Sequence, residues 1–364
     1  MYENITKTEA KQILSSDITD MLDIIKDIKK IKTTREITYS RNVFIPLTHA
    51  CKNNCGYCTF RKDINKMENY VLTKENVLKT VQQAKNTNCT EVLFAFGEAA
   101  DEYDEIKSQL ENWAYDSMVD YVYNLSDTIL NEYELLPHTN MGLISKKNLQ
   151  LLSTVNASMG LMLETTNKKL LKTIVHKDSP GKNPTKRLNF IKNAGKENIP
   201  FTTGLLIGIG EKLSDRADSL FEIRKLHNQY SHIQEIIIQN FKPKSNIPMK
   251  DYPEPSTKEL LKTTILAKLM FPDVSIQIPP NLNKNIKPFF IFSGADDIGG
   301  ISQVTKDYIN PGNTWPQIKE LESELNMIGY KLKERLPVYD KFINKKFLKE
   351  EVYKKAVKLQ STIN

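Results

Sequence analysis

The chain has 364 residues, of which 40% are hydrophobic and 26% are charged, the composition of a soluble globular protein with a sizeable buried core. Lys and Arg outnumber Asp and Glu by 51 to 44, but both signs are spread along the chain, so no nucleic-acid binder is indicated. The polar start MYENITKTEAKQ is unlike a secretory signal, and the longest apolar runs are too short to span a membrane. Four cysteines are too few for a disulfide framework. Together these features predict a cytoplasmic protein.

Taken in chain order, residues 1–36 are expected to form an amphipathic N-terminal helical extension. Short apolar runs then alternate with amphipathic stretches, which is the pattern of βα units around a parallel sheet. The eight candidate strands are VFIPL from Val43, VLFAF from Val92, YELLPH from Tyr133, SMGLMLE from Ser158, FTTGLLIG from Phe201, EIIIQNF from Glu235, VSIQIP from Val274 and, more weakly, PFFIFSG from Pro288. They predict an α/β fold in which a partial (β/α)6 barrel core is extended to (β/α)8. The barrel is expected to cover residues 37–315, and residues 316–364 are expected to form a C-terminal helical extension.

Three of the four cysteines lie close together in THACKNNCGYCTF, at the end of the first predicted strand. The spacing of Cys51, Cys55 and Cys58 allows three thiolates on one loop to hold one face of a metal centre. A cubane [4Fe–4S] cluster normally takes four cysteine ligands, so three ligands leave one iron open to bind another molecule. The fourth cysteine, Cys89, is isolated in NTNCTE and is not expected to be a ligand. The alternative is a structural zinc site with His49 as fourth ligand, although such sites usually combine paired C-x2-C units.

The string CKNNCGYC resembles the C-x3-C-x-aromatic-C signature of the radical S-adenosylmethionine (radical SAM) enzymes. The resemblance implies that the three cysteines hold a [4Fe–4S] cluster, that its free iron is chelated by SAM, and that the first six βα units bind SAM. Cleavage of SAM to methionine then gives a 5′-deoxyadenosyl radical, which abstracts hydrogen from the substrate. In this comparison Tyr57 takes the aromatic position near the adenine.

The same resemblance implies further SAM-binding residues at the carboxyl ends of strands, where α/β barrels place their chemistry. These candidates are Glu98 in FGEAAD, Glu164 in LMLETTN, Arg187 in HKDSPGKNPTKRL, and Gly204 and Gly208 in GLLIGIGE. The match at Glu98 is partial, because Phe96 replaces the first glycine of a Gly-Gly-Glu pattern. Surface ion pairs are the alternative for the charged candidates, and glycine-rich strand ends also occur in unrelated barrels.

Longer strings narrow the resemblance to one family. YSRNVFIPLTHACKNNCGYCTF, LLPHTNMG, HKDSPGKNPTKRL and GADDIGGIS are similar to the CofG subunit of 7,8-didemethyl-8-hydroxy-5-deazariboflavin (FO) synthase, and the similarity runs from about Tyr39 to Trp315. This family implies that the chain cyclises a tyrosine-derived hydroxybenzyl-ribityl-uracil adduct and releases ammonia. A CofH-type partner enzyme would supply the adduct, and an electron donor would reduce the cluster.

Several alternatives remain open at the level of sequence. A single three-cysteine loop means that the chain carries one half of the pathway, and this half can also be the one that adds tyrosine. Other radical SAM cyclases, such as a menaquinone-pathway cyclase, are further alternatives, whereas a biotin-synthase-like enzyme needs more cysteines for a second cluster. The non-enzyme alternative is a scaffold protein that uses the cysteine loop as a zinc knuckle.

An adduct with an aromatic ring, a uracil and a ribityl tail needs aromatic walls and several hydrogen-bonding groups at the mouth of the barrel. The substrate candidates are Tyr39, Arg41, Asn140, Gln239, Asn240, Asp296 and Asp297, and the candidates for catalytic proton transfer are His49, His138 and Asp297. The alternative for the Asp296–Asp297 pair is a helix N-cap or a turn. A lone histidine near a strand end is more often structural.

Overall fold

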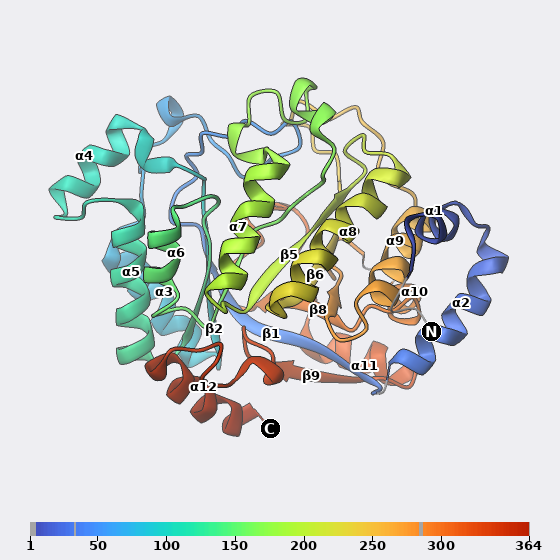
Figure 1. Cartoon of the computed structure of the whole chain (residues 1–364). Coiled ribbons are helices and arrows are strands. Elements are labelled where there is room, and N and C mark those ends of the chain that lie inside the picture. The colour runs from blue at the N-terminus through green and yellow to red at the C-terminus, as the bar shows by residue number, and fades with distance from the viewer. Residues whose placement is uncertain (1–4, 33, 284–286, 364) are drawn as a thin grey trace.

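Eight parallel strands close a barrel in the computed structural model of the chain, which describes residues 5–32, 34–283 and 287–363 (Figure 1). The strands are β1 (Glu36–Ile45), β2 (Glu91–Ala95), β3 (Leu136–Asn140), β4 (Ser158–Gly160), β5 (Phe201–Ile207), β6 (Ile233–Asn240), β7 (Ser275–Gln277) and β8 (Asp297–Ser302). Each strand pairs with the next along the chain, and β1 pairs with both β8 and β2. The predicted barrel of eight strands is confirmed.

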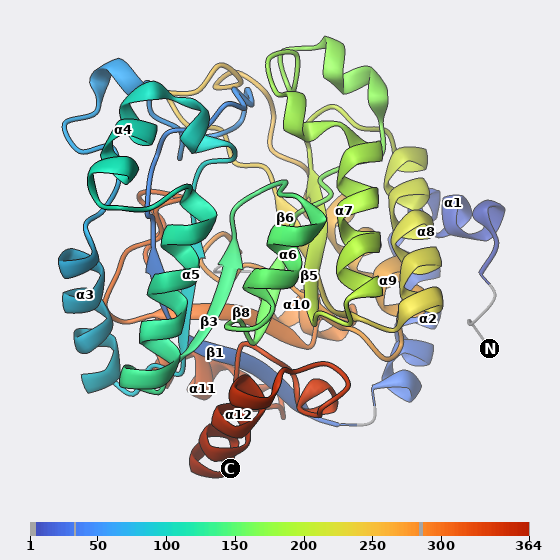
Figure 2. The same ribbon diagram turned by 60° about the vertical axis from the view of Figure 1, so that its left-hand side comes forward.

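Helices surround the barrel on its outer face (Figure 2). They are α3 (Lys74–Asn86), α4 (Asp104–Asn112), α5 (Met118–Thr128), α6 (Lys146–Leu152), α7 (Pro184–Lys196), α8 (Leu213–Tyr230), α9 (Thr257–Met270), α10 (Lys287–Phe292) and α11 (Ile318–Met327). Short turns of 3-10 helix lie at Ile64–Lys66, Ala100–Glu102, Lys168–Lys172, Pro180–Lys182 and Asp340–Phe342, and a π-helical turn lies at Ile129–Tyr133. Within the described ranges, none of the helices has the length and apolar character needed to cross a membrane.

The eighth strand is not the one that the sequence indicated. PFFIFSG from Pro288 was expected to be a strand but forms α10, and β8 is the following segment DIGGIS. A short apolar run does not distinguish a buried helix from a strand, and two glycines weaken the strand signal of DIGGIS. One of them, Gly300, lies so close to Asn42 of β1 that a Cβ atom would sit 2.1 Å from the Asn42 side-chain nitrogen. The glycine therefore lets β8 and β1 approach each other.

The N-terminal extension consists of two helices rather than one. They are α1 (Lys7–Ser15) and α2 (Ile18–Ile31), and Asp17 between them begins the second helix. Both helices pack on α9, and α1 also packs on α8, so the extension lies on the outside of the barrel wall.

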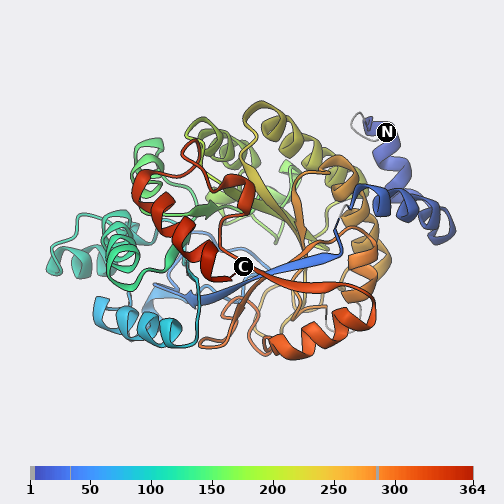
Figure 3. The same ribbon diagram turned by 90° about the horizontal axis from the view of Figure 1, so that it is seen from below.

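The C-terminal extension contains a ninth strand that the sequence did not indicate. This strand, β9 (Lys331–Arg335), pairs with the first half of β1, while β2 pairs with the second half. The chain then runs under the barrel and ends in α12 (Glu350–Ile363), as the view from below shows (Figure 3). The segment after α11 therefore closes the amino-terminal end of the barrel. We call this end the floor.

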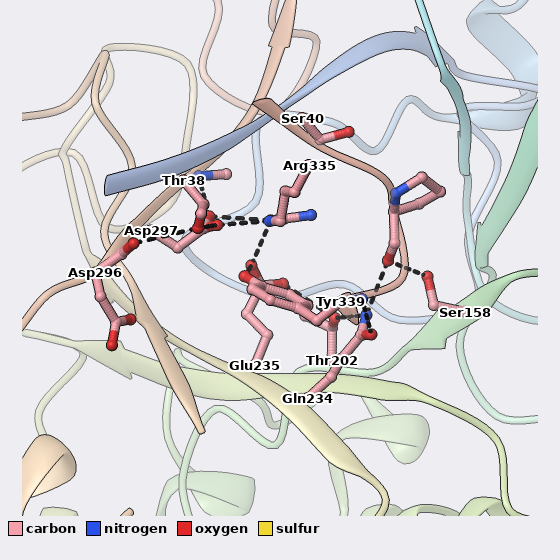
Figure 4. Close-up of polar contacts among 12 residues, drawn as sticks. Thr38, Ser40, Ser158, Thr202, Gln234, Glu235, Asp296, Asp297, Arg335 and Tyr339 are labelled. Carbon is pink, nitrogen blue, oxygen red and sulfur yellow. Dashed lines mark hydrogen bonds and ion pairs between the residues drawn. The ribbon is translucent and has the colours of Figure 1, made fainter. Parts of the chain in front are cut away.

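A buried polar network fixes this floor (Figure 4). Arg335 pairs through Nε with Asp297 Oδ2 at 2.5 Å and through Nη2 with Glu235 Oε1 at 2.8 Å. The Tyr339 hydroxyl donates to the same Glu235 oxygen at 2.9 Å. Burial raises the pKa of Glu235 to about 7, although Arg335 partly offsets it. Burial alone would also raise the pKa of Asp297, but the charge and hydrogen bonds of Arg335 hold that pKa below its usual value.

We predict that Arg335→Ala destabilises the fold strongly, because it leaves Asp297 and Glu235 buried without a counter-charge. Removal of one partner from a buried ion pair costs about 3–5 kcal/mol of the free energy of unfolding. The matched control is Lys333→Ala on the same strand, whose pair with Glu36 is exposed and should contribute less than about 1 kcal/mol. Urea unfolding followed by circular dichroism compares the two. Equal losses in both variants would show that the buried network does not hold the floor.

Candidate active site

A cavity of about 220 Å³ opens at the carboxyl ends of the barrel strands, opposite the floor. The cysteine loop, the ends of β2, β3 and β6, and the loops after β4 and β8 contribute to its lining. Ten of the predicted site residues line it, namely Cys51, Cys55, Tyr57, Cys58, Glu98, Asn140, Glu164, Arg187, Gln239 and Asn240. The structure therefore brings the three thiols, most of the SAM candidates and three of the substrate candidates into one space.

The cysteine loop is held in place by close contact with the end of β2. Gly97 lies so near that a Cβ atom would be 1.7 Å from the carbonyl oxygen of Ala50. The Gly97 amide donates to the carbonyl of Thr48 at 3.2 Å, and the Lys52 amide donates to the carbonyl of Glu98 at 3.0 Å. Only glycine at position 97 allows this approach. FGEAAD matches the Gly-Gly-Glu pattern only in part, but it keeps Gly97, the glycine that this close approach requires.

The residues around the thiols suit a three-ligand iron–sulfur cluster. The Glu98 amide donates to Cys51 Sγ at 3.2 Å, and the Ser179 hydroxyl donates to Cys55 Sγ at 3.4 Å. Hydrogen bonds to sulfur are one of the means by which proteins tune such clusters. Burial raises the pKa of Cys51, and raises that of Cys58 to about 11, so thiolates here need the positive charge of a bound metal centre.

The contacts of His49 and Cys89 argue against the zinc alternative and against a fourth thiol ligand. His49 donates from Nδ1 to the carbonyl of Phe60 at 2.8 Å and does not line the cavity. Cys89 is buried and donates to the carbonyl of Asn42 at 3.4 Å. No three His, Cys, Asp or Glu side chains in the described part of the chain converge on a single metal ion. A cubane cluster spreads its ligands over several irons, so its thiols need not meet at one point.

Glu98 and Arg187, both predicted to bind SAM, form a buried ion pair with each other. Arg187 Nη2 lies 3.2 Å from Glu98 Oε2, and Arg187 Nε donates to the carbonyl of Gly181 at 2.9 Å. The carboxylate is enclosed by two glycines, because a Cβ atom at Gly142 or Gly181 would lie 2.3 or 1.6 Å from Glu98. Arg187 also donates to the carbonyl of Met162. The pair therefore fixes the cavity wall beside the cysteines and presents charge to it.

Glu164 forms a second ion pair, with a residue that the sequence analysis missed. Lys182 Nζ lies 2.6 Å from Glu164 Oε1, and both side chains are almost buried. Lys182 also lies 5.8 Å from the centre of the Tyr57 ring, and the Tyr57 hydroxyl is 3.1 Å from His176 Nε2. Lys182 lies in HKDSPGKNPTKRL, the string in which the family resemblance indicates Arg187 as the SAM-binding residue. No local pattern distinguishes this lysine from its exposed neighbours, so only the folded loop reveals it.

Two predicted glycines shape the strands rather than line the cavity. Gly204 permits close packing of β5 on β6, since a Cβ atom there would lie 2.3 Å from the carbonyl oxygen of Ile237. Gly208 has a φ of +96° and donates its amide to the Glu211 carboxylate at 3.0 Å. Neither glycine lines the cavity, although Leu206 of β5 does.

The expectation that polar residues of β8 and β1 face the mouth of the barrel is wrong for four substrate candidates. Asp297 belongs to the floor network, and Asp296 pairs with Lys268 at 2.6 Å. Tyr39 and Arg41 both contact Glu334 of β9. Both aspartates precede or begin their strand, and β9 pairs with the first half of β1, so all four lie away from the carboxyl ends.

His138 lies inside the barrel below the cavity rather than at its mouth. The Ser158 hydroxyl donates its single hydrogen to the carbonyl of Pro337 at 2.7 Å. His138 Nδ1, which is 2.6 Å from Ser158 Oγ, must therefore carry the hydrogen of that contact. Burial lowers the pKa of His138 to about 3, so its ring is neutral. These contacts describe a structural histidine that helps to dock the C-terminal segment.

Comparison with known proteins identifies the family. Residues 45–223 match the Radical SAM superfamily, the class of protein that the barrel and the cysteine loop define. The 7,8-didemethyl-8-hydroxy-5-deazariboflavin synthase of Methanocaldococcus jannaschii is 49% identical over 98% of both chains. The protein of the same name from Methanothermobacter thermautotrophicus is 51% identical over 89% of this chain and 98% of its own. The chain therefore belongs to the family of these synthases, within the radical SAM superfamily.

A solved structure supports the fold independently of the function. The FeFe-hydrogenase maturase HydG from Carboxydothermus hydrogenoformans superimposes with a TM-score of 0.74 over 100% of this chain and 87% of its own, at 18% identity. Radical SAM enzymes use a [4Fe–4S] cluster and SAM, and the donor set described above fits both. The cluster and SAM are therefore the cofactors of this protein.

We predict that Cys51, Cys55 and Cys58 are cluster ligands and that Cys89 is not. After anaerobic reconstitution, an alanine at any of the first three positions should abolish the broad visible absorption of the cluster. Cys89→Ala should keep it, because this thiol is buried away from the cavity. Iron and sulfide analysis checks the result. Loss of the cluster in Cys89→Ala would contradict the three-ligand assignment, and a colourless zinc-loaded wild type would support the zinc alternative.

We predict that Glu164→Gln weakens SAM binding by about tenfold to a hundredfold, the loss expected for one buried hydrogen bond to a charged group. The substitution keeps the shape of the side chain but removes the charge that pairs with Lys182. The control is Glu259→Gln, which weakens an ion pair with Arg216 outside the cavity. Calorimetric titration of cluster-loaded protein with SAM measures the effect. Unchanged affinity in Glu164→Gln would remove this residue from the SAM site.

Proposed function

We propose that this chain catalyses the deazaflavin-forming half of FO synthesis. It cyclises 5-amino-5-(4-hydroxybenzyl)-6-(D-ribitylimino)-5,6-dihydrouracil to 7,8-didemethyl-8-hydroxy-5-deazariboflavin, with cleavage of SAM to 5′-deoxyadenosine and methionine and release of ammonium. The observation that carries the proposal is the 49% identity to a protein of that synthase name over 98% of both chains. The cavity supports it, because three thiols and several free amide groups share one space at the barrel mouth.

Different residues are proposed to bind the cluster and SAM. When bound, the cluster and SAM supply the radical that removes hydrogen from the substrate. We propose that Cys51, Cys55 and Cys58 hold the cluster. The ion pairs of Glu98 with Arg187 and of Glu164 with Lys182, together with Tyr57, are proposed to hold SAM beside it. These pairs are rigid because both partners are nearly buried, and rigid groups keep a reactive species on one path.

Neutral amides are proposed to hold the substrate. Asn140 and Gln239 line the cavity at the ends of β3 and β6, and their side chains form no hydrogen bond with other described residues. Such amides each offer a donor and an acceptor to a uracil or a ribityl hydroxyl. The aromatic rings of Phe60 and Phe241 line the same cavity and can exclude water around the hydroxybenzyl group.

The proposal includes partners and a location. The substrate already carries the hydroxybenzyl group of tyrosine, so a CofH-type enzyme must attach this group first. An electron donor must reduce the cluster, and we propose that both act with this chain in the cytoplasm. We also propose that residues 37–315 carry the site, whereas residues 1–36 and 316–364 are extensions that brace the barrel.

We predict that the preformed adduct, and not free tyrosine, is converted to the deazaflavin. The anaerobic assay supplies SAM and a reductant with either the adduct or tyrosine plus the ribityl-diaminouracil. The adduct should give a fluorescent deazaflavin together with methionine, 5′-deoxyadenosine and ammonium. The cluster-free Cys55→Ala variant is the control and should give none of these products. Consumption of free tyrosine with formation of the adduct would instead assign the chain to the other half of the pathway.

A further inference from the structure

Two carboxamides of the cavity are locked in opposite orientations by buried partners. They are Asn240 at the end of β6 and Asn310 in the loop after β8, and both line the cavity. Asn310 was not among the predicted substrate residues. An asparagine side chain offers an oxygen acceptor at one corner and two N–H donors at the other, so its neighbours decide which corner a ligand meets.

Asn283 fixes the orientation of Asn240. Asn283 Nδ2 donates to the carbonyl oxygen of Pro279 at 2.9 Å, and a carbonyl can only accept, so the nitrogen of Asn283 faces this side. The same nitrogen donates to Asn240 Oδ1 at 3.2 Å. Both asparagines are buried, and Asn240 is only 6% exposed. With its oxygen occupied, Asn240 presents its N–H donors to the cavity, and these have no acceptor among the other described residues.

Asp307 fixes Asn310 in the opposite sense. Asp307 Oδ1 accepts from the amides of Ile309 and Asn310 at 2.8 and 2.9 Å. Its Oδ2 accepts from Asn281 Nδ2 at 2.7 Å and from Asn310 Nδ2 at 3.2 Å. Both oxygens of Asp307 accept from N–H groups, so the amide nitrogen of Asn310 is the atom that faces Asp307. Asn310 therefore presents its oxygen as an acceptor, and this oxygen has no donor within the described ranges.

The loop that carries Asn310 is held firmly against the rest of the mouth. The Phe44 amide at the end of β1 donates to Thr305 Oγ1 at 3.0 Å, and the Thr59 hydroxyl of the cysteine loop donates to the carbonyl of Ile309 at 2.5 Å. The ring of Tyr308 stacks on Phe44 with 5.7 Å between ring centres. These contacts join the loop that carries Asn310 to β1 and to the cysteine loop.

We propose that Asn240 and Asn310 form a donor–acceptor pair that recognises the imide edge of the substrate's pyrimidinedione ring, with Asn283 and Asp307 as positioning residues. This inference rests on the proposed function. A hydroxyl can both donate and accept, so amides with fixed orientations do not select for a ribityl tail. An imide has a fixed pattern, a carbonyl acceptor next to an N–H donor, and only such a pattern is discriminated by fixed amides. Asn240 meets the carbonyl and Asn310 meets the N–H.

The first part of the test measures binding of the deazaflavin product, which keeps the imide edge, by its fluorescence in cluster-loaded full-length protein. Asn240→Asp keeps the acceptor that faces Asn283 but replaces the donor, so affinity should fall by about tenfold to a hundredfold. Asn283→Ala frees Asn240 to rotate and should cost about tenfold or less. Asn65→Asp, an exposed position outside the cavity, introduces the same charge and should leave affinity unchanged.

The second part changes the ligand instead of the protein. A deazaflavin methylated at the imide nitrogen should bind wild type at least about tenfold more weakly, because the donor for Asn310 is lost. In Asn310→Leu the same methyl group should cost little. Equal affinity of wild type for both ligands would overturn the imide assignment. It would also be overturned if methylation of the ligand lowered the affinity of wild type and of Asn310→Leu by the same factor.

Turnover of the adduct by wild type is measured separately. Absence of turnover with this binding pattern intact would overturn the proposed reaction and not the amide pair. Turnover together with undiminished product affinity in Asn240→Asp and Asn310→Leu would overturn the amide pair and not the reaction.

Discussion

The buried Glu98–Arg187 ion pair is the contact on which the mouth of this barrel depends. Through its backbone, Glu98 donates to Cys51 Sγ and accepts from the Lys52 amide, so it holds the cysteine loop in place. Through its carboxylate, it reaches Arg187 at the start of α7, and the arginine in turn holds the carbonyls of Gly181 and Met162. Glu98, which follows β2, therefore links the cysteine loop to the loop after β4. Loss of either charge would leave the other buried, which is far more costly than loss of a surface pair.

The sequence predicts the residues that stand in a recognisable short motif, and it does not predict those whose role depends on distant parts of the chain. The three cysteines lie on one loop, so their spacing alone predicts that they share one metal centre. Glu98, Glu164 and Arg187 follow predicted strands or lie in a helix start, and a family pattern finds them. Lys182 and Asn283 act on partners that are distant in sequence, Glu164 and Asn240, and Asp307 also holds the distant Asn281. Polar residues of this kind carry no period or motif, and folding alone reveals their partners.

The wrong assignments have a common physical cause. A polar residue beside an apolar run indicates the end of a strand but not which end, and the two ends of this barrel have opposite roles. Taking PFFIFSG as the eighth strand placed Asp296 and Asp297 after a strand, at the mouth. In the structure DIGGIS is the strand, so Asp296 precedes it and pairs with Lys268 of α9, whereas Asp297 begins it and joins the floor network. The C-terminal strand that supplies Arg335 was also missed, because KLKER shows little apolar alternation. Without that arginine, nothing in the sequence indicates that Asp297 has a buried partner.

The distribution of charge at the mouth is consistent with the proposed binding of two kinds of molecule, SAM and a neutral substrate. Both buried ion pairs lie beside the cysteines, whereas the free or oriented side chains of Asn240, Gln239 and Asn310 are neutral. SAM carries an ammonium, a carboxylate and a sulfonium, and such groups bind most strongly to charged partners that are already fixed. A uracil with a polyol tail is neutral. If it were buried against unpaired charges, those charges would lose their hydration without gaining an ion pair. Amides with fixed orientations avoid this cost and still distinguish a donor from an acceptor.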